Sequence, residues 1–231
     1  MTEQKKLVII PAFNEEQSIA GQCDEVRKKA GEYDIIVIND CSTDNTYGNC
    51  LANSVKVIDH AVNLGIGGAV QTGFRFAASA GYDVAVQIDG DGQHDAAFLR
   101  DMYDILIKER ADMVIGSRFI GNDGFQSTPL RRIGIRYFSW LIRSLTGKTI
   151  TDPTSGYRMV GRRLICDFAN DYPQDYPEPE SIVRSLRRGY RIVEVPVVMR
   201  PRKTGRSSIR LTASVYYMIK VTIAIVLERI R

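Results

Sequence analysis

The sequence predicts a Rossmann-like α/β protein with a mainly parallel sheet and helices on its faces. Short β-branched runs bounded by turn residues recur along the first half of the chain. Segments with helical periodicity separate these runs, and this alternation implies right-handed crossovers between parallel strands. The chain has 231 residues, of which 44% are hydrophobic and 25% charged. A chain of this size and composition can bury a substantial core.

The elements of the first half follow from these patterns in order. Buried strands are predicted at Leu7–Ile10, Ile35–Ile38, Val55–Ile58, Val84–Ile88 and Met113–Ile115. Helices are predicted between them at Ser18–Ala30, Gly68–Ala80 and Ala96–Glu109.

The second half has a looser pattern, and we expect it to form the acceptor side of a binding site. Its predicted elements are a loop at Gly121–Thr128, a helix at Pro129–Leu145, a late strand at Arg191–Met199, a basic loop at Arg200–Arg206 and a C-terminal helix. We therefore expect one domain over residues 1–208, followed by a C-terminal amphipathic helix over residues 209–231.

Charge and cysteine content narrow the function classes. Lys and Arg number 31 against 27 Asp and Glu, so the net charge is +4, which is too weakly basic to indicate a nucleic-acid partner. No C-x-x-C pair is present, so we expect no zinc site and a reduced, intracellular chain. The four cysteines are interpreted as small buried residues; they are Cys23, Cys41, Cys50 and Cys166.

Neither a signal peptide nor a membrane span is expected from the sequence. The apolar run Leu7–Ile10 is too short for a signal-peptide core. The most apolar segment, Leu211–Leu227, is interrupted by Lys220, and it falls short of the roughly 18 uncharged residues of a spanning helix.

The C-terminal segment has a pattern suited to a surface helix. We expect it to lie on a membrane surface or against a small membrane protein, since arginines precede it. Packing on the core or against a second copy of the chain is the alternative. The apolar side chains predicted to share one face are Leu211, Val215, Met218, Thr222 and Val226.

Acidic residues follow several predicted strands, at the edge where ligands bind in such sheets. Asp89 and Asp91 come directly after the fourth strand, with Gly90 and Gly92 allowing close approach of the backbone. Two carboxylates suit Mg²⁺ or Mn²⁺ held together with substrate phosphates, so the pair predicts a diphosphate substrate. A solvated acidic turn is the alternative, while Gln93 and the adjacent histidine either complete the shell or shape the turn.

Two further loops at the same edge have polar residues. We expect Asp40 to accept hydrogen bonds from a nucleobase imide or a ribose hydroxyl, and Asp44 to cap a helix. The segment Asn63–Gly68 resembles a phosphate cradle that opens a helix, although its spacing matches neither a Walker A loop nor G-x-G-x-x-G.

Taken together and in order, these motifs resemble an inverting family 2 glycosyltransferase over about Lys5 to Ser208. Within that family, the later motifs are similar to those of dolichyl-phosphate mannose synthases and bacterial polyprenyl-phosphate sugar transferases. The motifs are Pro11–Glu15, Asn39–Asp44, Asn63–Gly68, Asp89–Gln93, Gly116–Arg118, Asp152–Arg158 and Arg202–Ser207.

The resemblance implies a GT-A fold that binds a nucleotide-diphospho-sugar and a divalent cation, Mg²⁺ or Mn²⁺. Asp89, Asp91 and Gln93 would hold the cation. The residues it assigns to the nucleotide and donor are Pro11, Ala12, Glu15, Asp40, Gly68, Asp89 and Arg118.

The resemblance also implies a polyprenyl phosphate acceptor, with Arg131, Arg202 and Ser207 binding it and Asp152 and Arg202 near the reacting centre. A lipid monophosphate with a second pKa of about 6 is largely ionised at neutral pH and needs little base catalysis. Asp152 would then orient groups, whereas with a hydroxyl acceptor it would serve as the base. The enzyme is expected in the cytoplasm, peripheral at the inner face of the membrane.

Two features depart from the family pattern, and parts of the sequence are compatible with related functions. Asn39 stands where an Asp is usual, and the glutamates of Tyr176–Glu180 either face the sugar or begin a helix.

A sugar nucleotidyltransferase would need a basic Gly-rich loop after the first strand, which Pro11–Glu16 lacks. Transfer to a saccharide hydroxyl is compatible with the same residues, as is a nucleotide-sugar-binding subunit that needs a membrane partner.

Overall fold

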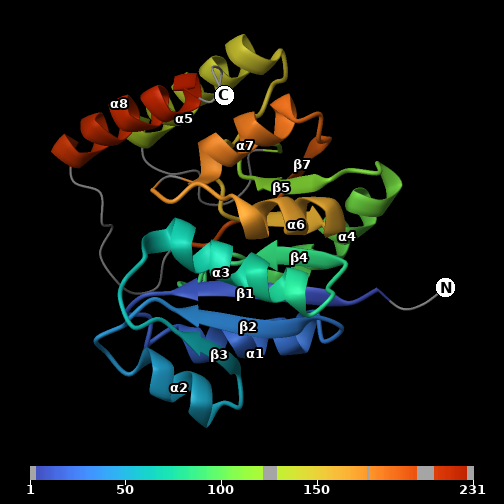
Figure 1. Ribbon diagram of the computed structural model, residues 1–231, viewed down its shortest axis with the longest axis vertical. Helices are drawn as coiled ribbons and strands as arrows, with labels where there is room; N and C mark the ends of the chain where they lie inside the picture. Colours follow the sequence, from blue (N-terminus) through green and yellow to red (C-terminus); the bar gives the residue numbers. More distant parts are fainter. Residues whose placement is uncertain (1–3, 122–128, 176, 202–210, 228–231) are drawn as a thin grey trace.

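The computed structural model describes residues 4–121, 129–175, 177–201 and 211–227. Figure 1 shows a central twisted sheet with helices on both faces. The strands are β1 (Lys6–Ala12), β2 (Asp34–Asn39), β3 (Lys56–Asp59), β4 (Val84–Gln87), β5 (Met113–Ser117), β6 (Arg158–Gly161) and β7 (Ile192–Pro196). The helices are α1 (Ile19–Lys29), α2 (Thr46–Ala52), α3 (Gly65–Ser79), α4 (Leu99–Lys108), α5 (Pro129–Thr146), α6 (Arg162–Asn170), α7 (Pro177–Arg187) and α8 (Leu211–Leu227), with a short 3₁₀ turn at Ala96–Phe98.

The strands form one sheet in the order β3-β2-β1-β4-β6-β5-β7. All neighbouring pairs are parallel except those of β6, which is antiparallel to both β4 and β5. The predicted α/β class and mainly parallel sheet are therefore confirmed. Chain order runs outward from β1 to β3 and then returns to β4 on the other side of β1, which creates a switch point between β1 and β4.

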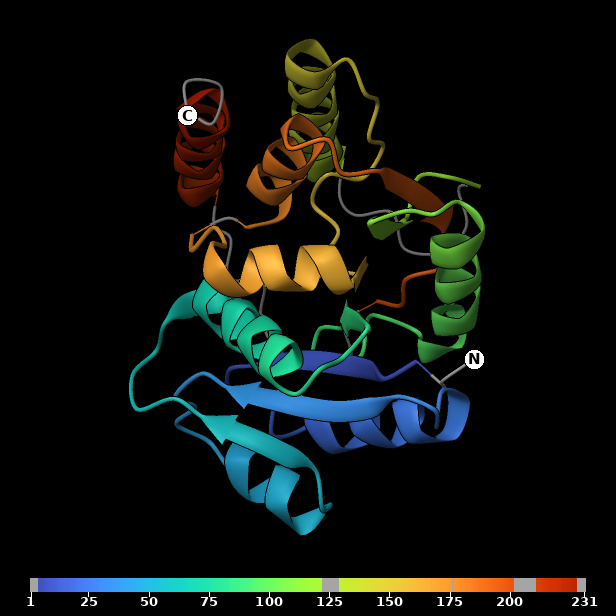
Figure 2. The same cartoon turned by 45° about the vertical axis from the view of Figure 1, so that its right-hand side comes forward.

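Alternation along the central strands places apolar side chains on both faces of the sheet. Leu7 and Ile9 of β1 pack with α3, α5, α6, α7 and α8, whereas Val8 and Ile10 pack with α1, α2 and α4. Figure 2 shows α5, α7 and α8 gathered at one end of the molecule, away from α1 and α2. Both clusters consist of residues with almost no solvent exposure, so the sheet is a rigid support for the loops at its edge.

The sequence missed β6 and α6, indicated α2 only through the capping role expected of Asp44, and left α7 as one of two alternatives for the glutamates of Tyr176–Glu180. Strand β6 has only four residues, and it begins with an arginine rather than a β-branched residue. Arg158 is nevertheless buried, because its guanidinium donates to the carbonyl oxygens of Ser155 (2.7 Å) and Pro153 (3.1 Å) and to Ser181 Oγ (2.8 Å). Tertiary hydrogen bonds, which local pattern does not reveal, thus place a charged residue inside the sheet.

Helix α8 packs against the rest of the molecule through one side and exposes the other. Val221 and Ile225 are fully buried, Met218 packs on the core, and Thr222 Oγ1 lies 3.1 Å from Tyr137 Oη of α5. The side chains exposed on α8 are Ile219, Ile223 and Val226. Met218 and Thr222 thus share one side of α8, and this side faces the core, which the sequence left open as the alternative, whereas Val226 of the same predicted face is exposed. The side chains of Leu211 and Val215 lie outside those that the structure describes. Among the described helices, none has both the length and the apolar character required to cross a bilayer.

Candidate active site

A cavity of about 490 Å³ opens at the carboxyl ends of β1, β2 and β4, beside the switch point of the sheet. This is where open α/β sheets bind their ligands. Six residues assigned from the sequence to the donor or the metal lie together in its wall, at the carboxyl end of β1 and in the loops that follow β1, β2 and β4. The lining residues are Pro11, Ala12, Phe13, Glu15, Asp40, Asn63, Gly65, Ile66, Ala69, Asp89, Gly90, Asp91 and Glu178.

The loop after β4 presents two carboxylates to this cavity. The Asp89 side chain is 37% exposed, while Asp91 is buried and its Oδ1 accepts a hydrogen bond from the Gln93 backbone N–H at 3.0 Å. His94 fixes the loop from the buried side: its Nδ1 accepts a hydrogen bond from the Asp89 N–H at 3.0 Å, and its ring stacks on that of Tyr157 with the ring centroids 4.8 Å apart. The histidine therefore shapes the turn.

These carboxylates suit a divalent cation bound jointly with a diphosphate. Among the described residues, no group of three or more His, Cys, Asp and Glu side chains is arranged as a complete cage. Mg²⁺ normally binds through one or two carboxylates together with substrate phosphates, and Asp89 and Asp91 supply such a pair. Gly156 leaves room for it, because a Cβ there would lie 3.1 Å from Asp89 Oδ1 and 3.3 Å from Oδ2.

Gln93, expected to assist the metal, does not line the cavity. Its Nε2 donates to the Arg200 carbonyl at 3.1 Å, and its own carbonyl accepts the Arg200 N–H at 3.0 Å. The structure therefore places this side chain against the segment that follows β7.

Glu178, at the start of α7, adds a third carboxylate beside Asp89 and Asp91. Burial raises the pKa of Glu178, the Arg158 guanidinium opposes that rise, and the Asp89 charge adds to it. From the sequence, two roles remained open for the glutamates of this segment: facing the sugar or starting a helix. Glu178 does both in part, since it lines the cavity and lies in the first turn of α7. Proline at the first helical position, here Pro177, is a signal that could have located the helix.

Asp40 lines the cavity, but its carboxylate also organises the loop before α3. Its Oδ1 accepts from Leu64 N at 2.8 Å and its Oδ2 from Gly65 N at 2.8 Å, and His60 Nδ1 lies 2.8 Å from Oδ1. Asp44 instead accepts from the backbone N–H of Thr46 at 3.0 Å, although the N-cap residue of α2 is Asn45, so Asp44 satisfies a donor at the helix start from one position before the predicted cap.

The glycines of the Asn63–Gly68 segment mainly permit close packing. Gly65 has φ +75°, in the left-handed region that favours glycine. A Cβ at Gly67 would lie 2.1 Å from the Gln174 carbonyl oxygen, and one at Gly68 would lie 2.5 Å from Leu64 Cβ. Gly68 lies outside the cavity wall, whereas Gly65 is part of it.

Arg118 and Asp152 form a buried ion pair outside the residues that line this cavity. Arg118 Nε lies 2.6 Å from Asp152 Oδ2 and its Nη2 lies 2.7 Å from Oδ1, while the Arg118 backbone N–H also donates to Oδ2 at 3.2 Å. Asp152 has no exposed surface and Arg118 is 8% exposed. The Asp152 N–H in turn donates to Glu194 Oε1 at 2.9 Å, and burial raises the pKa of Glu194.

The expected acceptor residues are placed only in part. Arg131 is exposed at the start of α5. Arg202 and Ser207 lie outside the described residues.

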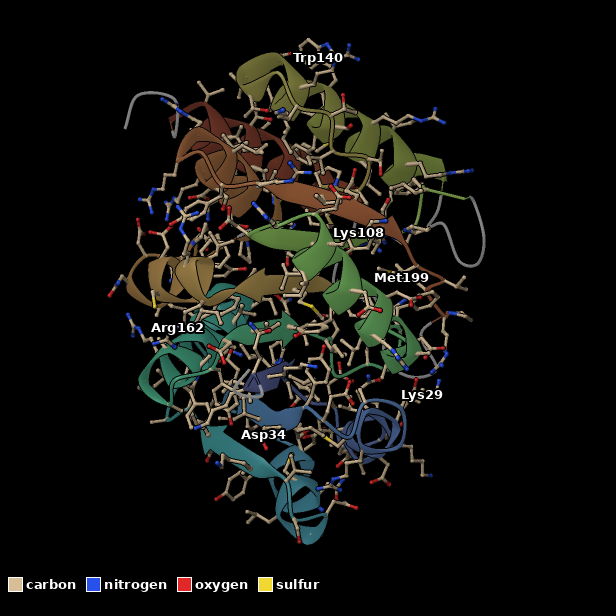
Figure 3. All side chains as sticks on the ribbon, turned by 90° about the vertical axis from the view of Figure 1, so that its right-hand side faces the viewer. Lys29, Asp34, Lys108, Trp140, Arg162 and Met199 are labelled. Carbon is tan, nitrogen blue, oxygen red and sulfur yellow. The ribbon has the colours of Figure 1, made fainter. Side chains whose placement is uncertain are left out.

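A second cavity, of about 470 Å³, lies along α5, and no sequence motif indicated it. It brings three guanidinium groups together with an exposed indole. Its lining residues are Phe119, Arg132, Ile135, Arg136, Ser139, Trp140, Arg143, Thr149 and Thr151. Trp140 is 60% exposed, and Figure 3 shows it at the outer end of the molecule.

Comparisons with known proteins agree with this geometry. The chain is 33% identical over 211 residues to an undecaprenyl-phosphate mannosyltransferase of Micrococcus luteus, covering 87% of this chain and 86% of that protein. It is 30% identical over 216 residues to a polyprenol monophosphomannose synthase of Mycolicibacterium smegmatis, covering 88% and 80%. The solved structure of glucosyl-3-phosphoglycerate synthase from Mycobacterium tuberculosis with Mn²⁺, UDP and glucosyl-3-phosphoglycerate superposes with a TM-score of 0.72 at 22% identity, covering 98% of this chain and 80% of that one.

The structural likeness establishes the GT-A type of fold, as expected from the motifs. The model of the family described as "Glycosyl transferase family 2" matches residues 7–168, which include β1 to β6 and the carboxylates of the cavity except Glu178. Since this match covers well over half of the chain, the protein belongs to glycosyl transferase family 2 and is a glycosyltransferase.

Proposed function

We propose that this protein is a metal-dependent inverting glycosyltransferase that moves a sugar from a nucleotide-diphospho-sugar to a polyprenyl phosphate. The observation that carries the proposal is the cavity at the switch point, in which Asp89 and Asp91 face the same space as Asp40 and Glu15. The names of the M. luteus and M. smegmatis relatives support the choice of a polyprenyl phosphate acceptor.

The nucleoside end of the donor is assigned to the loops after β1 and β2. Pro11, Ala12 and Glu15 would contact the nucleoside, and Asp40 would accept a hydrogen bond from the base. Asn39 is not available for this, because its amide donates to Asp59 Oδ1 at 2.6 Å and its carbonyl oxygen accepts from Ser42 Oγ. We therefore assign recognition of the base at the end of β2 to Asp40.

The diphosphate end is assigned to the loop after β4. Asp89 and Asp91 would hold Mg²⁺ or Mn²⁺, which supplies positive charge to the leaving diphosphate when bound. An acceptor phosphate oxygen attacks the anomeric carbon from the opposite side, forming the new C–O bond as the bond to the diphosphate breaks. The electron pair leaves with the nucleoside diphosphate, which inverts the configuration.

Asp152 is assigned an orienting role. Both of its oxygens already receive hydrogen bonds from Arg118, so removing a proton from an acceptor would require this pair to open first. A phosphate acceptor is largely ionised at neutral pH and needs no such base. Arg131, Arg202 and Ser207 are proposed to bind that phosphate.

We assign membrane contact to the surface formed by α5 and α8, peripheral at the inner face of the cytoplasmic membrane. Trp140 of α5 and Ile219 and Ile223 of α8 are each more than half exposed, and the arginines of the α5 cavity can meet anionic headgroups. In this assignment residues 209–231 act as the attachment helix of a catalytic domain over 1–208.

A transfer assay tests the function directly. Labelled UDP-, GDP- and dTDP-sugars are incubated with polyprenyl phosphate and Mg²⁺ or Mn²⁺, and lipid-linked sugar is counted. Product that requires both the metal and the lipid phosphate is the expected result, and Asp91→Ala should abolish it. Transfer to a saccharide hydroxyl would overturn the proposed acceptor, and donor binding without any transfer would indicate a binding subunit instead of an enzyme.

The Arg202→Ala variant tests the acceptor assignment. Because a guanidinium grips phosphate through two parallel hydrogen bonds, this variant should lose most transfer while keeping its affinity for the nucleotide. Unchanged transfer would remove Arg202 from the site.

A further inference from the structure

His60 is held between two groups at the edge of the nucleotide cavity. It directly follows β3, its side chain is 9% exposed, and its backbone N–H donates to the Asn39 carbonyl at 2.9 Å. Its Nδ1 lies 2.8 Å from Asp40 Oδ1, and its Nε2 lies 3.0 Å from Thr72 Oγ1 of α3. The ring therefore connects helix α3 to the carboxylate that faces the cavity.

The direction of the hydrogen bond to Asp40 follows from chemistry. An ionised carboxylate only accepts hydrogen bonds, so the short contact requires a proton on His60 Nδ1. The Thr72 hydroxyl has one proton: when it donates to the Gly68 carbonyl at 2.9 Å it accepts from Nε2, and when it turns that proton toward the ring it donates to Nε2 instead. In both arrangements His60 donates to Asp40, and Thr72 fixes the other side of the ring.

This contact determines which acceptor site of Asp40 is left for a ligand. The two oxygens of a carboxylate offer about four lone-pair directions. His60 Nδ1 and Leu64 N occupy Oδ1, and Gly65 N occupies one direction of Oδ2. As far as the described part of the chain is concerned, one acceptor direction on Oδ2 then remains, on a carboxylate that lines the cavity.

We propose that His60 is a positioning residue that fixes Asp40 as a single acceptor for the base of the donor nucleotide. Such an acceptor selects bases with a ring N–H at the pairing edge, namely uracil, thymine and guanine. It disfavours cytosine and adenine, whose ring nitrogen at that position is itself an acceptor and would repel the carboxylate. This inference rests on the proposed nucleotide site, and it adds a residue outside the cavity wall to the determinants of donor choice.

Two amide substitutions separate the two ends of the ring. The Asn side chain places its N–H₂ near the position of His Nδ1, so His60→Asn keeps a donor for Asp40 and loses the contact to Thr72. The longer Gln side chain places its N–H₂ near the position of Nε2, so His60→Gln keeps the contact to Thr72 and loses the donor to Asp40. Thr72→Val is the matched control, since it removes the hydroxyl and leaves the histidine intact.

The measurement is the dissociation constant of UDP, GDP, CDP and ADP by titration calorimetry in Mn²⁺, with thermal unfolding to confirm that each variant is folded. The wild-type chain should favour at least one of UDP and GDP over both CDP and ADP. His60→Asn and Thr72→Val should keep this preference within about threefold. His60→Gln should reduce it by about tenfold or more, because a hydrogen bond to a charged group is lost, while binding of CDP and ADP changes little.

Three outcomes would overturn the inference. Wild-type preference in His60→Gln would show that Asp40 needs no positioning. Equal weakening of all four nucleotides in His60→Asn and His60→Gln would show that the ring serves packing alone. A wild-type chain that binds nucleoside diphosphates without discrimination would remove Asp40 from base recognition, and one that binds none would overturn the proposed function itself.

Discussion

Replacing Asp152 by Asn separates an orienting carboxylate from a catalytic base. Arg118 Nε and its backbone N–H both donate to Oδ2, and Arg118 Nη2 donates to Oδ1. Asn turns one of these two acceptors into a donor, so either orientation of its amide sets N–H against N–H. The substitution also removes the negative charge beside a guanidinium that is only 8% exposed.

The size of the effect follows from burial. Breaking a buried ion pair by removing one partner costs about 3–5 kcal/mol. A chain of this length loses about 2–4 °C of melting temperature per kcal/mol, so Asp152→Asn should lower the Tm by roughly 6–20 °C. Thermal unfolding followed by circular dichroism measures this, and the transfer assay is run below the melting transition of the variant.

A double variant provides the control. Arg118→Gln combined with Asp152→Asn leaves no unpaired charge, so it should be more stable than Asp152→Asn alone. If Asp152→Asn instead melts at the wild-type temperature and loses turnover, the carboxylate acts on the substrate and the orienting role is wrong.

Further predictions concern the metal, the membrane and the thiols. Gly156→Ala, whose Cβ would lie 3.1 Å from Asp89 Oδ1, should raise the Mn²⁺ concentration needed for half-maximal transfer several-fold; an unchanged requirement would separate Asp89 from the metal. Trp140, the only tryptophan of the chain, should shift its emission to shorter wavelength with anionic vesicles but not with neutral ones, and no shift would argue against α5 as a membrane surface. Burial raises the pKa of the Cys23 thiol to about 12, so its thiolate is scarce at neutral pH and iodoacetamide should label the partly exposed Cys41 and Cys166 before Cys23; early labelling of Cys23 would contradict its burial.

The first half of the chain was predictable from the sequence because the local hydrophobic pattern there agrees with the position of each element in the folded sheet. The runs around β1, β2 and β4 are apolar on both faces, and the polar loops that follow them lie together by the geometry of a parallel sheet. Asp89 and Asp91 thus share a cavity with Asp40, as their positions after the strands indicated.

The second half was less predictable because its elements depend on distant partners. Arg158 lies in a buried strand through hydrogen bonds to Pro153 and Ser181. The start of α7 at Pro177 was one of two alternatives that the sequence left open for this segment. Helix α8 is apolar around much of its circumference, so periodicity alone did not determine which side faces the core. The prediction that all four cysteines are buried was correct for Cys23 and Cys50, whereas Cys41 and Cys166 are partly exposed.

Gln93 illustrates how a residue in a recognisable motif can serve a different task in the fold. Its backbone and side chain both bond to the backbone of Arg200, and the adjacent His94 forms a β-bridge with Met199. The Arg200 guanidinium is fixed in turn by Glu25 at 2.6 Å and Asp95 at 2.5 Å. The loop that bears Asp89 and Asp91 is therefore joined to the segment that continues toward Arg202, so a displacement of either one is opposed by the same hydrogen bonds. This physical link between the loop after β4 and Arg200 depends on pairing between segments far apart in the chain, which no local motif contains.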